Sequence, residues 1–143
     1  MKDAINVEWT GEMAFTAVVN NHAIVLDASP DVGGKNKGPR PKPLLMASLA
    51  GCTGMDVISI LKKMKVEPDS FIVKVKADLT DEHPKYYTAI KLVYEFTGRN
   101  LPADKIRRAV ELSQERYCGV SATLKKALDL SYEINILEKQ AAV

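Results

Sequence analysis

One apolar stretch near the middle of the chain, residues 41–61, constrains the fold more than any other part of the sequence. It has neither the two-residue alternation of a strand nor the broad polar face of a surface helix. Its large apolar side chains cover most of a helical circumference: Leu44, Leu45, Met46, Leu49, Met55, Val57, Ile58, Ile60 and Leu61. A helix that is apolar nearly all round is a buried helix. We therefore expect a long buried helix from about Pro43 to Lys65, at the centre of a single core.

This expected helix approaches the length of a membrane span, but its polar residues favour a place inside a soluble protein. Ser48, Asp56, Ser59, Lys62 and Lys63 interrupt the apolar run, and no second span follows in the sequence. The N-terminus leads into a strand-like pattern without the apolar region of a signal peptide. We expect a cytoplasmic protein that makes no use of a membrane.

Length and charge narrow the classes of partner. The 143 residues suffice for one domain, residues 1–143, with a sizeable core, and they are too few for two domains that each have a core of that kind. The 20 basic and 18 acidic residues leave a net charge of +2, and no long basic run accompanies them. Because the expected strands also carry no aromatic RNA-recognition motif on their apolar inner faces, we expect no nucleic-acid partner.

The remaining pattern predicts an α+β chain of antiparallel sheets with the element order βββ-α-ββ-α-α-β. Short strands over residues 5–10, 15–19 and 22–27 form a three-stranded meander, and a Gly-, Pro- and Lys-rich loop follows over residues 29–41. Two long alternating strands, 71–79 and 86–97, form a hairpin that packs on the central helix. A helix over residues 101–117, a short helix to residue 127 capped by Ser121, a strand over 130–137 and a frayed tail from Lys139 complete the chain.

The two cysteines, Cys52 and Cys118, are the candidate reactive groups. They lie 66 positions apart, with no Cys-x-x-Cys and only two histidines, so the spacing predicts no metal site, and no cofactor is expected. A reducing compartment also argues against a permanent disulfide. Cys118 lies at a helix break where backbone amides could lower the pKa of its thiol. Cys52 lies between Gly51 and Gly54, where the absent side chains leave room for a substrate.

Two interpretations of these cysteines stay open. A free cysteine often serves as a small buried hydrophobe, and nothing in the spacing alone brings the two together. Asp56 follows Cys52 by one helical turn and Ser48 precedes it by one turn, so the three share a stripe. Either that stripe is a polar, water-accessible seam leading to the sulfur, or Asp56 pairs with a lysine or caps a group across a dimer interface.

Two motifs resemble those of the OsmC/Ohr family of osmotically inducible and organic hydroperoxide resistance proteins. Residues 32–41 contain a Gly-Gly and a Gly-Pro-Arg-Pro sequence, and residues 49–52 read Leu-Ala-Gly-Cys. Residues 118–121, Cys-Gly-Val-Ser, are similar to the family's second motif, Cys-Pro-hydrophobic-Ser. The expected order of helices and strands agrees with that family along nearly the whole chain.

The resemblance implies an OsmC-like fold and an intertwined homodimer with a role in the stress response. It also implies a thiol-dependent peroxidase, in which Cys52 attacks a hydroperoxide and becomes a sulfenic acid. Cys118 would resolve that acid as a Cys52–Cys118 disulfide, which an external dithiol would reduce.

The chain departs from the family's pattern at three positions. The family's peroxidases carry a strand arginine and a carboxylate partner nine or ten residues before the first cysteine. Here the segment from Ile5 to Asp27 has no arginine, and Lys42 and Pro43 occupy the carboxylate positions. Gly119 replaces the motif's proline. Arg40, Lys42 or Arg116 could supply the activating charge, and a small-ligand-binding protein with idle cysteines is the alternative function.

Overall fold

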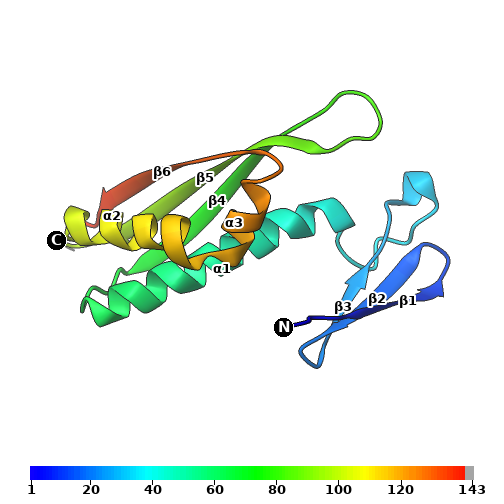
Figure 1. The fold of residues 1–143 in the computed structure, drawn as a ribbon, viewed down its shortest axis with the longest axis horizontal. Helices are drawn as coiled ribbons and strands as arrows, with labels where there is room; N and C mark the ends of the chain where they lie inside the picture. The colour runs from blue at the N-terminus through cyan, green and yellow to red at the C-terminus, as the bar shows by residue number, and fades with distance from the viewer. Residues whose placement is uncertain (141–143) are drawn as a thin grey trace. The chain divides into compact units, whose positions relative to one another are not determined.

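The computed structural model describes residues 1–140, and the contacts within it divide the chain into two compact units. The first unit runs from Met1 to Ala47 and the second begins at Ser48. Each unit is described by itself. The α+β class expected from the sequence is confirmed, with two three-stranded sheets and three α-helices among the described residues (Figure 1).

The first unit contains the expected antiparallel meander, β1 (Asn6–Gly11), β2 (Ala14–Val19) and β3 (His22–Leu26), in that spatial order. Each strand lies within one residue of its predicted bounds. Asn20 and Asn21 make the second turn with φ of 48° and 65°. Asparagine tolerates this left-handed region better than most residues, which explains why the turn could be predicted from its residues.

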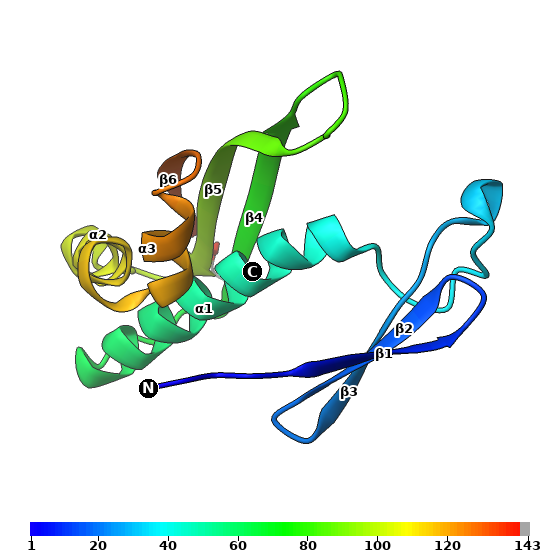
Figure 2. The same ribbon diagram turned by 45° about the vertical axis from the view of Figure 1, so that its right-hand side comes forward.

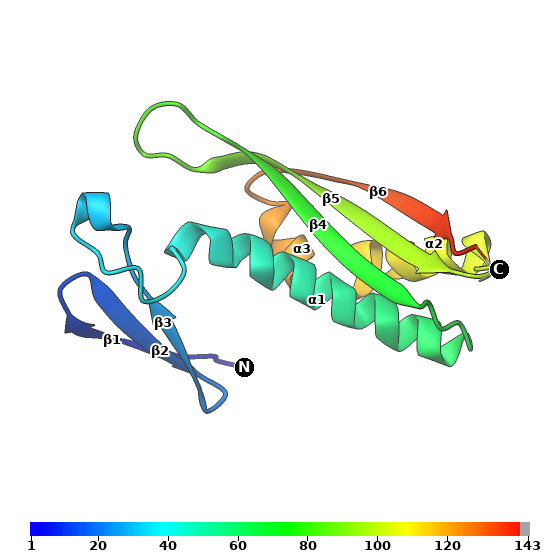
Figure 3. The ribbon, with the colours of Figure 1, turned by 180° about the vertical axis from the view of Figure 1, so that it is seen from behind.

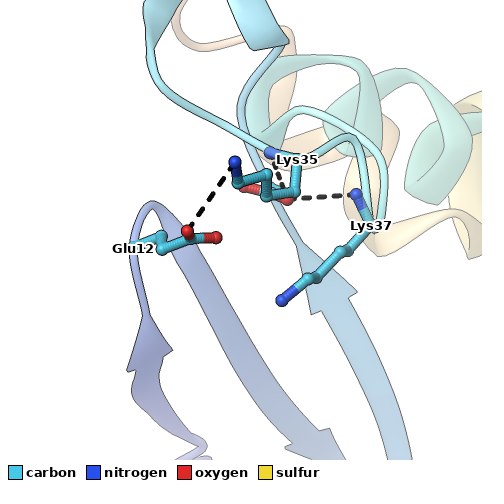
Figure 4. A network of polar contacts seen from close by, with 4 residues as sticks. Glu12, Lys35 and Lys37 are labelled. Atoms are coloured by element: carbon cyan, nitrogen blue, oxygen red, sulfur yellow. Dashed lines mark hydrogen bonds and ion pairs between the residues drawn. The ribbon is translucent and has the colours of Figure 1, made fainter.

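The loop after β3 is ordered by Asp27. Its side chain is 4% exposed, and its carboxylate accepts hydrogen bonds from the backbone N–H groups of Ala28, Lys35 and Lys37 at 2.8, 3.1 and 3.0 Å. The Lys37 amide contributes most to holding the pKa of Asp27 below its usual value. Figure 4 shows Lys35 and Lys37 at this loop, with the Lys35 ammonium 3.8 Å from the Glu12 carboxylate. These hydrogen bonds therefore give the loop a defined conformation, which includes the short helical turn η1 (Pro30–Val32).

The long helix α1 (Pro41–Lys63) begins two residues before its predicted start and ends two before its predicted end. Within the chain it buries one stripe, Leu49, Thr53, Val57 and Leu61, at spacings of four residues. Other apolar side chains stay outside, and Met55 is 76% exposed. The prediction of a helix buried all round is thus met on one side only, because a single sheet can cover only one side. By length and composition α1 could also cross a membrane, a property shared by core helices of soluble proteins.

The second sheet has the order β4 (Ser70–Leu79), β5 (Tyr87–Gly98), β6 (Asp129–Glu138). β4 and β5 form the predicted antiparallel hairpin, but β6 runs parallel to β5, with Ala89 opposite Asp129. The expectation of antiparallel sheets is wrong at this pair. The helical segment between β5 and β6 carries the chain back to the starting end of β5, and such a crossover joins parallel strands (Figures 1 and 3).

The core of the second unit lies on one face of this sheet. Four alternating residues of β5, Ile90, Leu92, Tyr94 and Phe96, are at most 1% exposed. The Phe71 ring of β4 stacks on Phe96 with centroids 4.4 Å apart. Both α1 and the segment after α2 (Ala103–Leu112) reach the Tyr94 hydroxyl, so they cover the same face of the sheet (Figure 2).

The chain between α2 and β6 differs from its predicted form. The expected helix to residue 117 ends at Leu112, and a single π-helical turn, η2 (Ser113–Tyr117), follows. The short helix α3 (Gly119–Leu124) is capped by Cys118, whose sulfur accepts from the Ser121 N–H, so the prediction of Ser121 as the cap is wrong. Lys139 donates its backbone N–H to Gly98, so this tail residue is held; residues 141–143 lie outside the described part.

Candidate thiol site

Three side chains with reactive or ligating atoms meet in the second unit. The two sulfurs of Cys52 and Cys118 and one carboxylate oxygen of Asp56 all lie within 4.8 Å of one another. Cys52 and Asp56 occupy successive turns of α1, whereas Cys118 arrives from the end of η2. Both cysteines are free thiols; Cys52 is half-buried and Cys118 is only 3% exposed. The fold thus brings together two cysteines that sequence spacing left apart.

The π-helical turn sets the position of Cys118. The Cys118 N–H donates to the Ser113 carbonyl at 2.8 Å, five residues earlier, which closes the wide turn. Cys118 itself has extended backbone, with φ −74° and ψ 101°, and its sulfur accepts from the Ser121 N–H at 3.4 Å. One hydrogen bond to a residue before Cys118 and one from a residue after it therefore fix the position of its sulfur next to α1.

A chain of buried hydroxyl groups runs from the sheet to Asp56. The Tyr94 hydroxyl lies 2.6 Å from Thr53 Oγ1, which lies 2.7 Å from Ser113 Oγ. Ser113 Oγ donates to Asp56 Oδ2 at 3.0 Å. Ser113 donates its one hydroxyl proton to Asp56, so its oxygen must accept from Thr53. By the same argument Thr53 accepts from Tyr94, and the direction of every bond in this relay is determined.

The relay also determines the orientation of the Gln114 amide. Because Tyr94 donates to Thr53, its oxygen is free to accept, and Gln114 Nε2 donates to it at 2.7 Å. Nε2 also lies 3.1 Å from Ser121 Oγ, next to the Cys118 turn. The Gln114 carbonyl oxygen Oε1 has no partner among the described residues. Gln114 links the sheet, the π turn and α3 around the two cysteines.

The surroundings of Cys52 favour the neutral thiol. Burial raises the pKa of the Cys52 thiol, the backbone amide of Val120 acts in the opposite direction, and Cys118 and Asp56 raise it further. Burial likewise raises the pKa of Tyr94 to about 12, so its phenol is neutral at any physiological pH. The Cys52 thiol is thus held in its neutral form beside the Cys118 sulfur and the Asp56 side chain.

The candidate activating cations divide between the two units. Arg116 lies within the π turn, and its guanidinium lies over the neighbouring Tyr117 ring at 5.7 Å from the centroid. Arg40 belongs to the first unit and donates to Asn36 and to the Gly38 carbonyl. The ion pairs described within residues 1–140 do not include Asp56, so its predicted pairing with a lysine is not among them.

The sequence and the fold of this chain match a known family. The model of the OsmC-like protein family matches residues 34–133, and the chain belongs to that family. The resemblance seen in the two cysteine motifs is confirmed.

Similar proteins extend this relation over nearly the whole chain. Protein YhfA of Escherichia coli is 33% identical over 131 residues, which cover 90% of this chain and 95% of YhfA. A crystal structure of a hypothetical protein from Aquifex aeolicus superposes with a TM-score of 0.83 at 28% identity, covering 98% of this chain and 99% of that one. The organic hydroperoxide resistance protein OhrB of Bacillus subtilis, at 18% identity and a TM-score of 0.63, covers 93% and 98% and shares the fold.

Sequence reasoning found both cysteines and noticed Asp56, but it missed the polar residues that join them. Thr53, Tyr94, Ser113 and Gln114 are spread over three elements, and no local pattern marks them as a group. One signal was present: Thr53 occupies the buried stripe of an otherwise apolar helix face. A buried hydroxyl needs a partner, so its place in the stripe predicts polar groups across the core.

Proposed function

We propose that this protein is a thiol-dependent peroxidase that reduces organic or other hydroperoxides through Cys52 and Cys118. The observation that carries the proposal is the meeting of the two sulfurs within 4.8 Å, although they come from separate elements. Membership of the OsmC-like family supports it, and so does the likeness of the fold to proteins named for organic hydroperoxide resistance.

The difference in exposure supports the roles we propose for the two cysteines. Cys118 is 3% exposed, and its sulfur already accepts from the Ser121 N–H, whereas Cys52 is only half-buried and is therefore the better candidate for the peroxidatic residue. The Cys52 thiolate attacks the terminal oxygen of R–O–O–H, the O–O bond breaks, and R–O⁻ leaves and takes up a proton as ROH. Cys52 is thereby oxidised to the sulfenic acid, Cys–S–OH.

The second half of the cycle returns the protein to its dithiol form. The Cys118 thiol attacks the sulfenic sulfur, a disulfide forms, and water leaves. An external dithiol then reduces the disulfide and becomes a disulfide itself. A reducing compartment such as the cytoplasm would supply that dithiol, so we place the protein there.

We also propose that the protein acts as a homodimer. The support is the incomplete burial of α1 within one chain, where Leu45 is 46% and Met55 76% exposed on a helix otherwise rich in apolar residues. Exposed apolar surface of this kind is covered in a stable assembly. Sedimentation at several protein concentrations tests it, and a concentration-independent monomer mass would refute the dimer.

Stopped-flow mixing with cumene hydroperoxide tests the activity. Loss of free thiol should follow peroxide addition in the wild-type chain and vanish in Cys52→Ser. Ser59→Ala, one exposed residue on the same helix, is the matched control and should react as the wild type does. Equal peroxide consumption by the wild type and Cys52→Ser would reject the peroxidase.

The alternative is a small-ligand-binding protein with idle cysteines. One open groove of about 450 Å³ lies along α1 and β4, lined by small and apolar residues that include Gly51, Gly54 and Phe71. The cysteines do not line it. If the peroxide test fails, saturable binding of an apolar fluorescent probe that Gly54→Leu removes would support this function instead.

A further inference from the structure

We propose that the reduced protein binds one thiophilic divalent cation of the zinc type through Cys52, Asp56 and Cys118. The three ligand atoms, two sulfurs and a carboxylate oxygen, already lie within 4.8 Å of one another. They come from two turns of α1 and from the end of η2, so the site does not depend on a local sequence motif. This inference goes beyond the peroxidase and does not rest on it.

The distances suit a tetrahedral ion. Zinc binds sulfur at about 2.3 Å and carboxylate oxygen at about 2.0–2.2 Å, which places neighbouring ligand atoms roughly 3.5–3.8 Å apart. The observed spread of at most 4.8 Å closes to that value by side-chain movement of about 1 Å. Cys52 and Asp56 are one helical turn apart on α1 and can share a ligand face, so no backbone rearrangement is needed.

The hydrogen bonds that the proposed ligands accept from neighbouring groups are a second observation that supports a metal site. Ser113 Oγ donates to Asp56 Oδ2 at 3.0 Å, which orients the carboxylate and leaves its other oxygen for a cation. The Ser121 N–H donates to the Cys118 sulfur at 3.4 Å. Hydrogen bonds of this kind hold ligands in place and tune them in known metal sites. The Ser113 hydroxyl also lies 2.7 Å from Thr53 Oγ1, and this second contact holds it in place beside Asp56.

The donor atoms at the site suit a cation. Two sulfurs and one carboxylate oxygen lie together in a half-buried space, and none of the ion pairs described within residues 1–140 includes Asp56. Cysteine binds a metal as its thiolate, so binding of a divalent cation would release the thiol protons.

The donor set selects the class of ion. Two thiolates favour zinc and other thiophilic ions over magnesium and calcium, which require mostly oxygen ligands. Three protein ligands leave a fourth position for water, unlike the closed four-ligand sites that hold folds together. Metal binding and disulfide formation use the same two sulfurs, so each state excludes the other.

The experiment uses the reduced full-length chain, freed of metal with a chelator. Zinc is titrated in competition with a chromogenic chelator, and cobalt replaces zinc as a spectroscopic probe. We expect one zinc per chain, together with a sulfur-to-cobalt charge-transfer band and the intense visible bands of tetrahedral cobalt. Cys52→Ser and Cys118→Ser should each lower zinc affinity by more than a hundredfold and remove the charge-transfer intensity of the lost sulfur.

Asp56→Asn is the decisive variant, because it keeps both cysteines. Its zinc affinity should fall at least about tenfold, because an amide oxygen is a weaker ligand than a carboxylate and loss of an outer-shell partner alone costs about 10–100-fold. Asp129→Asn, an exposed acidic residue at the start of β6, is the matched control and should bind zinc as the wild type does. Unchanged affinity in Asp56→Asn or Cys52→Ser would overturn the site. The titration contains no peroxide, so failure of the peroxidase leaves this result readable on its own.

Discussion

Thr53→Val tests the buried relay on which the geometry of the site depends. Valine matches the shape of threonine, but it removes the hydroxyl that lies 2.6 Å from Tyr94, 2.7 Å from Ser113 and 3.3 Å from Gln114 Nε2. Thr53 is fully buried, so water cannot replace the lost partner. Tyr94 and Ser113 each keep one other hydrogen bond in the network, and Gln114 keeps two.

The magnitude follows from these contacts. Two short hydrogen bonds and one long one disappear at a net value of about 1 kcal/mol each, and the Tyr94 proton loses its acceptor. We expect the free energy of unfolding to fall by about 2–3 kcal/mol. With a urea dependence of roughly 2 kcal/mol per molar, the unfolding midpoint should drop by roughly 1–1.5 M.

The assay is urea unfolding followed by far-ultraviolet circular dichroism at one fixed protein concentration, since association would shift the midpoint. Thr88→Val is the control: it removes one 3.4 Å bond from an exposed threonine of β5 and should change the midpoint little. Equal midpoints for Thr53→Val and the wild type would refute the directed relay as a stabilising structure.

Three further perturbations test other parts of the account. First, burial raises the pKa of the Cys52 thiol, so the oxidation of this thiol by peroxide in metal-free protein should accelerate about tenfold per pH unit from pH 6 to 8. Asp56→Asn should be oxidised faster at each pH, because it removes a charge that raises that pKa. A rate independent of pH would contradict this prediction. Second, backbone hydrogen bonds lower the pKa of Asp27 from its ordinary value of 3.8, so the Asp27 carboxylate stabilises the folded state above that pH. This contribution is lost as the pH falls through the lowered pKa. Asp27→Asn should flatten the acid limb of a stability–pH curve, and exposed Asp81→Asn should not. Third, Gly119→Pro should raise the free energy of unfolding by about 0.4–1 kcal/mol, because Gly119 is the first residue of α3 and a side chain there meets open space. A lower melting temperature in this variant would contradict the backbone conformation described for the start of α3.

The strands and the central helix were predictable from the sequence because their signals are local. Alternation over residues 71–79 marks β4, and Asn20-Asn21 marks the turn between β2 and β3. The direction of β6 was not predictable from alternation, which is the same for parallel and antiparallel strands. It depends on the crossover through α2, η2 and α3.

The candidate site shows the same division. The cysteine motifs marked Cys52 and Cys118, and the helical spacing marked Asp56, but the relay behind them depends on tertiary contacts. Spacing rules for zinc ligands do not mark this cluster because they describe ligands close in sequence, whereas Cys118 is brought to α1 by the π turn at Ser113. The exposed apolar side of α1 illustrates a further limit: the apolar pattern of a helix indicates how much of its surface is to be buried, but it does not indicate which element or partner buries it.

The most direct test of the central claim is the intact mass of three proteins after one equivalent of cumene hydroperoxide. The account predicts loss of two hydrogens in the wild type, as Cys52 and Cys118 form a disulfide. Cys118→Ser should instead gain one oxygen on Cys52, or a label that traps sulfenic acid, while Cys52→Ser stays unchanged. Identical masses before and after peroxide in the wild type, or equal oxidation of Cys52→Ser and the wild type, would contradict a peroxidatic Cys52 resolved by Cys118.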